Sequence, residues 1–218
     1  MNRRSIGYLC GFALIVTAGL LGVAFWAGLS VWPRQGGWNE RPLEGLQSFG
    51  AVPDFSLTER SGEKIELSDL RGKIWITNFI YTSCKDTCPL QSAEMARLQS
   101  DLSDGTDVRL VSISVDPERD TPAVLSRYAE RFHADPRRWL FLTGEKQVIY
   151  RLAQEGFHLS AVPAQSNEGK NDGAFIHSSR FVLVDGQTQI RGYYDSNDAD
   201  ALQRLRQDAK MLLRGHRA

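Results

Sequence analysis

Two cysteines at close spacing are the residues of this chain most suited to chemistry. Cys84 and Cys88 have three residues between them, with Pro89 directly after, in the stretch YTSCKDTCPL. Thiolates act as nucleophiles in disulfide exchange and as soft ligands for metals. Thioredoxin-type redox pairs have two intervening residues, and zinc knuckles usually come as two such pairs. The spacing alone therefore leaves a redox site and a metal site both open.

A strand and a helix are expected to position this pair. The apolar run KIWITNFIY precedes the cysteines and is typical of a buried central strand. The stretch PLQSAEMARLQSDLS follows them with helical spacing and with Pro89 in the first turn. The residues expected on its inward face are Leu90, Ala93, Met95, Leu98 and Leu102. The free N–H groups at a helix N-terminus lower thiol pKa values, which favours both kinds of chemistry.

The elements around this unit follow a β-α-β-α order. A hairpin is predicted around Ser61-Gly62, and VRLVSISVD is predicted as a second buried strand. In the next helix, Asp120 or Thr121 is the expected cap and Pro122 the first turn. A short strand is then predicted in RRWLFLT and a helix in EKQVIYRLAQEGF, with Val148, Leu152 and Phe157 facing inward.

The C-terminal part predicts a hairpin and a closing helix. Residues 160–175 are polar and predict a long loop. The hairpin is expected to turn at Asp185-Gly186, and an amphipathic helix ends the chain. The whole order predicts an α/β, thioredoxin-like fold with an N-terminal β-hairpin extension and an insertion. The cysteines then lie at the C-terminal end of a strand, where α/β folds keep their sites.

A third residue for the site is sought where thioredoxin-like proteins carry a cis-proline opposite the cysteines. Counting back from Asp185 places Ser179 near that position, and no proline follows Pro163. His177 lies two residues before Ser179, so the fold would bring an imidazole beside the thiols. At this point His177 is either a third metal ligand or a structural hydrogen-bonding residue. The three other histidines, His133, His158 and His216, have no cysteine neighbour in this topology.

The N-terminal residues predict a membrane anchor. Residues 5–33 contain no charged residue and are long enough to cross a bilayer as a helix. Arg3 and Arg4 favour a cytoplasmic N-terminus and an exported domain. The alternative is a cleaved signal peptide, but the apolar stretch is longer than that of a signal peptide and no clear cleavage site follows it. Cys10 lies within this apolar stretch and is interpreted as an ordinary residue of the membrane helix. We therefore expect an anchor over 1–34, a stalk over 35–50 and one folded domain over 51–218.

The composition excludes two further classes of protein. The chain has 26 basic and 26 acidic residues, so no nucleic-acid partner is expected. Its three cysteines are too few for a disulfide scaffold.

Three stretches in this order resemble one family. The stretches YTSCKDTCPLQSAEMARLQ, VSISVDPERDTP and FIHSSRFVLVDGQ closely resemble the Sco/SenC family of copper-binding cytochrome c oxidase assembly proteins. The resemblance covers about residues 50–213 and implies that Cys84, Cys88 and His177 bind one copper ion, as Cu(I) or Cu(II). It further implies delivery of copper to the CuA centre in the copper-accepting subunit of cytochrome c oxidase, which makes the chain a metallochaperone and not necessarily an enzyme.

The chain departs from the family at two places near these ligands. Lys85-Asp86-Thr87 replaces the usual Pro-Asp-Val between the cysteines, and Ile176 stands where an aspartate usually precedes the histidine. These changes leave the ligands in place but alter their surroundings, and so bear on transfer and on the choice of partner.

Two acidic residues are candidates for a supporting role. Asp86, between the cysteines, is expected on the surface, where it could meet a partner or neutralise Lys85. Asp116, in VDPERDTP, could support the site, although this stretch is also typical of an ordinary strand-to-helix turn.

Other functions remain open beside copper delivery. Zn(II) is the competing metal for such ligands. A membrane-tethered thiol:disulfide oxidoreductase, with Cys84 and Cys88 as the redox-active residues, is the principal alternative, and a peroxiredoxin-like peroxidase is a weaker one. The short segment before the apolar stretch favours the bacterial inner membrane, with the domain in the periplasm, over the mitochondrial inner membrane.

Overall fold

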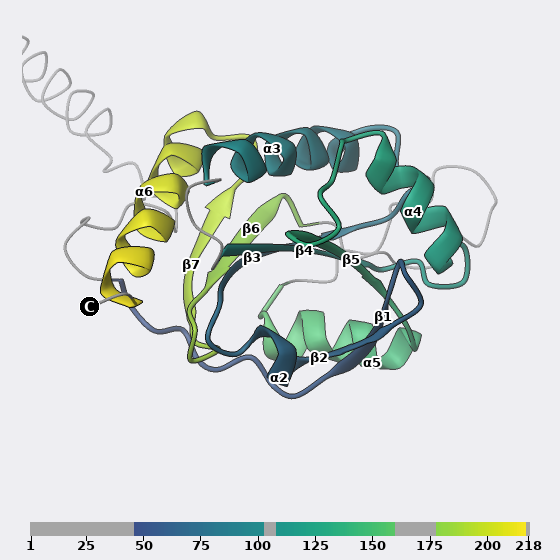
Figure 1. The fold of residues 1–218 in the computed structure, drawn as a ribbon, viewed down its shortest axis with the longest axis horizontal. Helices are drawn as coiled ribbons and strands as arrows, with labels where there is room; N and C mark the ends of the chain where they lie inside the picture. The colour runs from purple at the N-terminus through teal and green to yellow at the C-terminus, as the bar shows by residue number, and fades with distance from the viewer. Residues whose placement is uncertain (1–45, 103–107, 160–177, 217–218) are drawn as a thin grey trace, which may run out of the picture. The chain divides into compact units, whose positions relative to one another are not determined.

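The structure is a computed structural model that describes residues 46–102, 108–159 and 178–216. These residues form a seven-stranded mixed sheet with helices on both faces (Figure 1). The strands are β1 Ser56–Glu59, β2 Lys64–Glu66, β3 Ile74–Ile80, β4 Val108–Ser114, β5 Trp139–Thr143, β6 Arg180–Val184 and β7 Ile190–Asp195. The helices are α2 Leu67–Leu70, α3 Thr87–Asp101, α4 Pro122–Glu130, α5 Lys146–Arg151 and α6 Ala199–His216, and a π-helical turn, Leu152–Gly156, continues α5.

The strand order is β2-β1-β5-β4-β3-β6-β7. Strands β3, β4 and β5 run parallel, whereas β6 is antiparallel to β3 and β7 is antiparallel to β6. Together with α3 and α6, the strands β4-β3-β6-β7 form the thioredoxin-like arrangement that the sequence predicted. Strand β5 and the β1-β2 hairpin extend the sheet beyond β4, and this hairpin is the predicted N-terminal extension.

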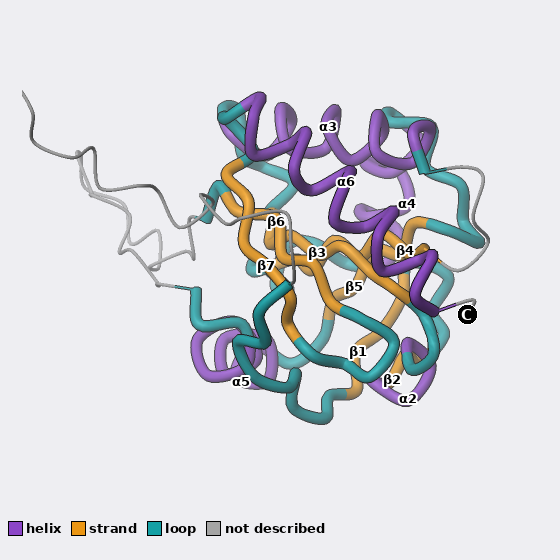
Figure 2. The backbone as a smooth tube through the Cα atoms, turned by 90° about the vertical axis from the view of Figure 1, so that its left-hand side faces the viewer, coloured by secondary structure: helices purple, strands orange, loops and turns teal. Residues whose placement is uncertain are grey.

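Two apolar layers cover the sheet. Helices α3, α4 and α6 lie over one face, whereas α2 and α5 lie over the other (Figures 1 and 2). Every residue of β3 is buried, as predicted for the central strand. Its side chains alternate between the layers, with Ile74 and Ile76 on the α3 side and Trp75 and Phe79 on the α5 side. Strand β3 is therefore fixed from both faces where it leads into the cysteine loop.

The inward face of helix α3 agrees with the prediction except at the start of the helix. Met95, Leu98 and Leu102 are buried as expected and Ala93 is half-buried, but Leu90 is 61% exposed. Because the helix begins at Thr87 and buries Cys88, the positions one turn later on that face are Gln91 and Ser92, and both are buried. The apolar spacing predicted the helix correctly. In its first turns, however, the inward positions are occupied by Cys88, Gln91 and Ser92 and not by Leu90.

Some local features differ from the sequence predictions. The short helix α2 was not predicted, and the predicted helix over 145–157 consists of α5 and the π-helical turn. Leu152 and Phe157 are buried as expected, whereas Val148 is only half-buried. No helix within the described ranges is long and apolar enough to span a membrane. The predicted anchor over 1–34, most of the stalk, and the 160–175 loop lie outside the described residues.

Candidate metal centre

The two cysteines lie where β3 gives way to α3. The backbone N–H of Cys84 donates to the carbonyl of Tyr81 at 3.2 Å, which closes a turn directly after the strand. The backbone N–H of Cys88, in the first turn of α3, donates to Cys84 Sγ at 3.4 Å. Both residues are free thiols, and Cys88 is buried whereas Cys84 is half-buried. The fold thus brings the sulfur of Cys84 onto the N-terminus of the helix that carries Cys88.

The two thiols have opposite electrostatic surroundings. Burial acts to raise the pKa of Cys84, but hydrogen bonds from the backbone of Cys88 and Asp86 stabilise its thiolate, so that its pKa is lowered. Burial raises the pKa of Cys88 to about 12. At neutral pH Cys84 is therefore the better nucleophile and the readier ligand. A metal that bound both sulfurs would have to displace the proton of Cys88.

A buried aspartate holds the loop that leads to Cys84. Asp120 is fully buried, and its carboxylate accepts hydrogen bonds from the N–H of Thr82 at 3.0 Å and from Thr82 Oγ1 at 2.5 Å. Ser114 Oγ, at the end of β4, donates to the same carboxylate at 2.6 Å. Asp120 therefore ties the end of β4 to the residue two positions before Cys84.

This role of Asp120 was missed in the sequence, where it was a candidate helix cap. The cap of α4 is Thr121, whose side chain accepts a hydrogen bond from the N–H of Val124 at 3.4 Å. Only one of two adjacent candidates can occupy the cap position, so the other was available for a different contact. The presence of two adjacent candidates for one cap position was the only signal in the sequence that could have indicated another role for Asp120.

The structure separates the two acidic residues that were predicted to support the site. Asp116 is buried at the end of β4, where its N–H donates to Ser114 Oγ at 3.1 Å and its carbonyl accepts from the N–H of Asp120 at 2.8 Å. Burial, together with the charge of Asp120, raises the pKa of Asp116. Asp116 thus belongs to the network behind the cysteine loop.

Asp86 has a different environment. It is exposed, as expected, and its side chain caps no N–H group of α3. It is therefore a surface residue between the two cysteines.

A small cavity lies beside Cys88 at the start of β6. Its volume is about 200 Å³. It is lined by Phe79, Tyr81, Thr87, Cys88, Gln91, Ser178, Ser179 and Asn197. Cys88 and Ser179 line the same cavity, which confirms the prediction that Ser179 lies close to the cysteines.

The predicted third ligand, His177, lies outside the described residues. Its covalent neighbour Ser178 lines the cavity beside Cys88. Within the described part of the chain, no group of three or more histidine, cysteine, aspartate or glutamate residues is arranged to hold a metal ion. The described part of the candidate site is therefore the thiol pair.

Fold and site together define the class of protein: a thioredoxin-like protein with a C-x-x-x-C pair at the N-terminus of the helix after its central strand. A sequence model of the SCO1/SenC family matches residues 45–213. The chain therefore belongs to the SCO1/SenC family, as the resemblance of its motifs suggested.

Relatives in this family agree with the assignment. The SCO1 protein homolog of Bacillus subtilis is 35% identical over 134 residues, which are 61% of this chain and 67% of the relative. A structure of BsSco, a member of the Sco family of cytochrome c oxidase assembly proteins in which a disulfide switch was identified, matches with a TM-score of 0.66 at 29% identity. That match covers 78% of this chain and 97% of BsSco.

A copper-bound relative has also been solved. The structure of Bradyrhizobium japonicum ScoI with copper bound matches with a TM-score of 0.61 at 26% identity. The match covers 75% of this chain and 99% of ScoI.

Proposed function

We propose that this chain is a copper metallochaperone that delivers copper to the CuA centre of cytochrome c oxidase during its assembly. The observation that carries the proposal is the pair of free thiols, Cys84 and Cys88, brought together at the N-terminus of α3, with Cys88 lining the cavity at the start of β6. Two relatives with the same fold support it, since ScoI of Bradyrhizobium japonicum was solved with copper and BsSco belongs to a family of oxidase assembly proteins. His177 is the proposed third ligand.

The ligand set suits the cargo. Two thiolates and one imidazole are soft to borderline donors that favour Cu(I), with Zn(II) as the competing metal. Because Cys84 is half-buried, thiolates of an acceptor can reach the copper before those of the donor leave. Such stepwise exchange transfers the ion without releasing it to water. We expect one copper ion per chain.

The proposed setting is the outer face of a membrane. Residues 1–34 are the proposed anchor, residues 35–50 the stalk, and residues 51–218 the domain that carries the site. The uncharged stretch over 5–33 and the arginines before it support this arrangement. We place the protein in the bacterial inner membrane with its domain in the periplasm, where the copper-accepting oxidase subunit is the partner.

The second candidate function is a thiol:disulfide oxidoreductase that keeps oxidase cysteines reduced. The lowered pKa of Cys84 and the burial of Cys88 favour it, and the disulfide switch of BsSco is in keeping with it. In this reaction the Cys84 thiolate attacks a partner disulfide. Cys88 then loses its proton and resolves the mixed disulfide, so that the partner gains two electrons and this chain forms a Cys84–Cys88 disulfide.

The experiment that separates the two functions changes His177 to Ala. An imidazole is needed by a copper site but not by a dithiol that exchanges through mixed disulfides. We expect His177→Ala to lower copper affinity and CuA-oxidase activity together at limiting copper, while the purified protein still reduces disulfides. His216→Ala, a histidine in the last turn of α6, is the matched control and should match the wild type in all three measurements.

Cysteine variants complete this test. Cys84→Ala and Cys88→Ala should each abolish tight copper binding and disulfide reduction, because both functions use both sulfurs. If His177→Ala cells assembled the oxidase normally while the cysteine variants failed, the reductase function would replace copper delivery. Equal copper retention by the wild type and both cysteine variants would rule out the proposed site.

A further inference from the structure

One residue at the end of β3 contacts both thiols. Tyr81 directly follows the strand, and its carbonyl accepts the N–H of Cys84 at 3.2 Å. Its own backbone N–H donates to the sulfur of Cys88, and its phenol is hydrogen-bonded to the sulfur of Cys84. Tyr81 and Cys88 also line the same cavity. A single half-buried tyrosine is therefore in contact with both sulfur atoms of the pair.

The contacts of Tyr81 differ in what they require of its side chain. The two that its backbone makes are available to any residue except proline. The contact to Cys84 needs the phenol O–H, and phenylalanine has the same ring without it. Tyr81 packs against both apolar layers of the sheet, where a phenyl ring would pack equally well. The hydroxyl is thus the part of this residue that packing does not explain.

The strength of the contact between the phenol and the sulfur depends on the redox state of the pair. The phenol keeps its proton at neutral pH, because the ordinary pKa of tyrosine is about 10 and burial raises the pKa of Tyr81 further. A thiolate is a charged acceptor and receives a strong hydrogen bond, whereas the neutral sulfur of a disulfide is a weak acceptor. The contact therefore stabilises the reduced pair more than the oxidised pair.

We infer that Tyr81 sets the redox balance of the thiol pair by donating its phenol hydrogen to Cys84. When oxidised glutathione oxidises the pair, the Cys84 thiolate attacks one sulfur and releases a glutathione thiolate. Cys88 then loses its proton and displaces the second glutathione, so that two electrons leave this chain. Because the phenol loses its charged acceptor in this reaction, Tyr81 opposes it.

This role goes beyond copper delivery, since it requires no bound metal. By opposing oxidation, Tyr81 keeps the thiols free, which is the form that a soft metal binds. The same contact makes the pair a weaker reductant. It therefore suits a site that keeps its thiols for a metal better than a site that transfers its electrons to a partner disulfide.

A second tyrosine near the pair provides a matched control. Tyr128 of α4 is 3% exposed, and its hydroxyl pairs with Ser92 Oγ at 2.9 Å, one turn after Cys88 in α3. Removing this hydroxyl also deletes a hydrogen bond close to the thiols. Its partner, however, is an uncharged hydroxyl that oxidation of the pair does not change. Tyr128→Phe should therefore alter both redox forms alike.

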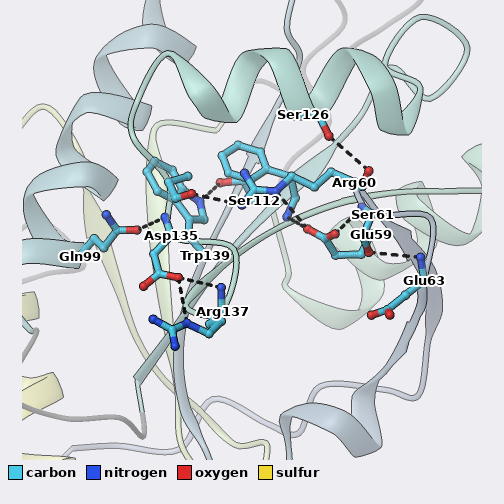
Figure 3. Close-up of polar contacts among 12 residues, drawn as sticks. Glu59, Arg60, Ser61, Glu63, Gln99, Ser112, Ser126, Asp135, Arg137 and Trp139 are labelled. Carbon is cyan, nitrogen blue, oxygen red and sulfur yellow. Dashed lines mark hydrogen bonds and ion pairs between the residues drawn. The ribbon is translucent and has the colours of Figure 1, made fainter.

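A remote control comes from the other end of α3. Gln99 Oε1 accepts a hydrogen bond there from the N–H of Asp135 at 2.9 Å (Figure 3). Gln99→Met removes this hydrogen bond from the helix that carries Cys88, but at the end away from the thiols. It should leave the redox balance of the pair unchanged.

The test is the equilibrium between the pair and glutathione or dithiothreitol redox buffers at pH 7, measured on the full-length chain. All proteins carry Cys10→Ala, which leaves Cys84 and Cys88 as the only thiols. Because hydrogen bonds to charged groups are stronger than average, we expect Tyr81→Phe to favour the disulfide about tenfold, or about 30 mV for a two-electron couple. Tyr128→Phe and Gln99→Met should each shift the equilibrium by less than about twofold.

A second measurement separates this role from a general loss of packing. Urea unfolding is compared for the reduced form and the disulfide form of each protein. Tyr81→Phe should destabilise the reduced form and leave the disulfide form unchanged, because only the thiolate receives the strong hydrogen bond. Tyr128→Phe should destabilise both forms equally.

The outcomes distinguish this inference from the proposed function. An unchanged equilibrium in Tyr81→Phe, a shift toward the free thiols, or an equal shift in Tyr128→Phe would show that the phenol does not set the balance. A wild-type pair that forms no disulfide in these buffers would overturn the inference as well. Copper delivery would stand in each case, because it is tested by metal binding to the cysteine variants. Conversely, a wild type that bound no copper would overturn copper delivery and leave the redox result intact.

Discussion

The two ends of helix α3 are built in contrasting ways. At its C-terminal end, Arg138 donates to the carbonyls of Gln99 at 3.0 Å and Leu102 at 2.9 Å, which are the acceptors that a helix end leaves free. Arg206 of α6 also pairs with Asp101 at 2.6 Å. At its N-terminal end the helix carries thiols, and the buried Oε1 of Gln91 accepts no hydrogen bond from the described residues.

This difference distinguishes the polar groups that stabilise the fold from those that form a functional site. The C-terminal end is completed by positive charges, which suit the negative end of the helix dipole. The N-terminal end could have been completed by an acidic cap, but Asp86 makes no cap hydrogen bond and the sulfur of Cys84 accepts the N–H of Cys88 instead. A helix whose first turn donates the N–H of Cys88 to sulfur stabilises a thiolate there, which is of use for chemistry rather than for packing.

The largest effect is expected from a variant that removes the support of the N-terminal end of α3. Asp120→Ala removes the acceptor for the N–H and hydroxyl of Thr82 and for the hydroxyl of Ser114. Because hydrogen bonds to a buried charged group are stronger than average, we expect a loss of about 3 kcal/mol in the free energy of unfolding. Urea unfolding of the reduced apo protein measures it. Asp86→Ala, an exposed acid, should change that energy by less than about 0.5 kcal/mol. Equal effects of the two variants would contradict the anchoring role of Asp120.

A pH titration tests the raised pKa of Cys88. The unfolded chain releases this proton near the ordinary cysteine pKa of about 8.5, whereas the folded chain keeps it up to a pKa of about 12. Above pH 8.5 the folded state therefore binds more protons, so its stability falls as pH rises, by about 2 kcal/mol at pH 10. Urea unfolding of the reduced apo protein at pH 8 and pH 10 measures this. A Cys88→Ser variant should lack this part of the loss, and an identical pH dependence would contradict the assignment.

The next effect is expected at the C-terminal end. Arg138→Met keeps most of the apolar stem but removes the two donors to the helix carbonyls, so we expect a loss of about 1 kcal/mol in the free energy of unfolding. Copper affinity should not change, because this end of α3 is remote from the thiols. Arg137→Met, at an exposed neighbouring position, should be neutral within about 0.5 kcal/mol. A clear loss of copper affinity in Arg138→Met would break the distinction between the two ends.

The smallest effect is expected at Leu90, which the sequence predicted on the inward face of α3. Leu90 is 61% exposed in the first turn of α3, so Leu90→Ser should change the free energy of unfolding by less than about 0.5 kcal/mol. Thermal or urea unfolding of the reduced protein measures it. A loss of 2 kcal/mol or more would show that Leu90 packs inside and that the observed face of α3 is wrong.

The sequence predicted the fold better than it predicted the support of the site. Local patterns were enough for the β1-β2 hairpin, for the buried strand β3, and for Pro122 at the start of α4. The thioredoxin-like order was also enough to bring Ser179 near Cys88. These features depend on hydrophobic period, turn residues and connection rules, all of which a single chain displays.

The contacts that could not be predicted join residues far apart in the chain. Asp120 contacts Thr82, and Gln91 contacts Ser178, and neither pair has a local pattern. The same reason explains the wrong prediction for Leu90, because hydrophobic spacing could not foresee that the neighbouring Gln91 would be the buried residue. His177 lies outside the described residues, so its assignment as a ligand stays a prediction.

The pairing of β3 has a consequence for how the protein is made. Strand β3 pairs with β4 soon after it in the chain, but its other neighbour is β6, and Trp75 lies opposite Val184. A ribosome completes Cys84 and Cys88 long before it completes the strand that closes the cavity beside them. The wall of the cavity that Ser178 and Ser179 supply is therefore complete only after the C-terminal hairpin of β6 and β7 has joined the sheet.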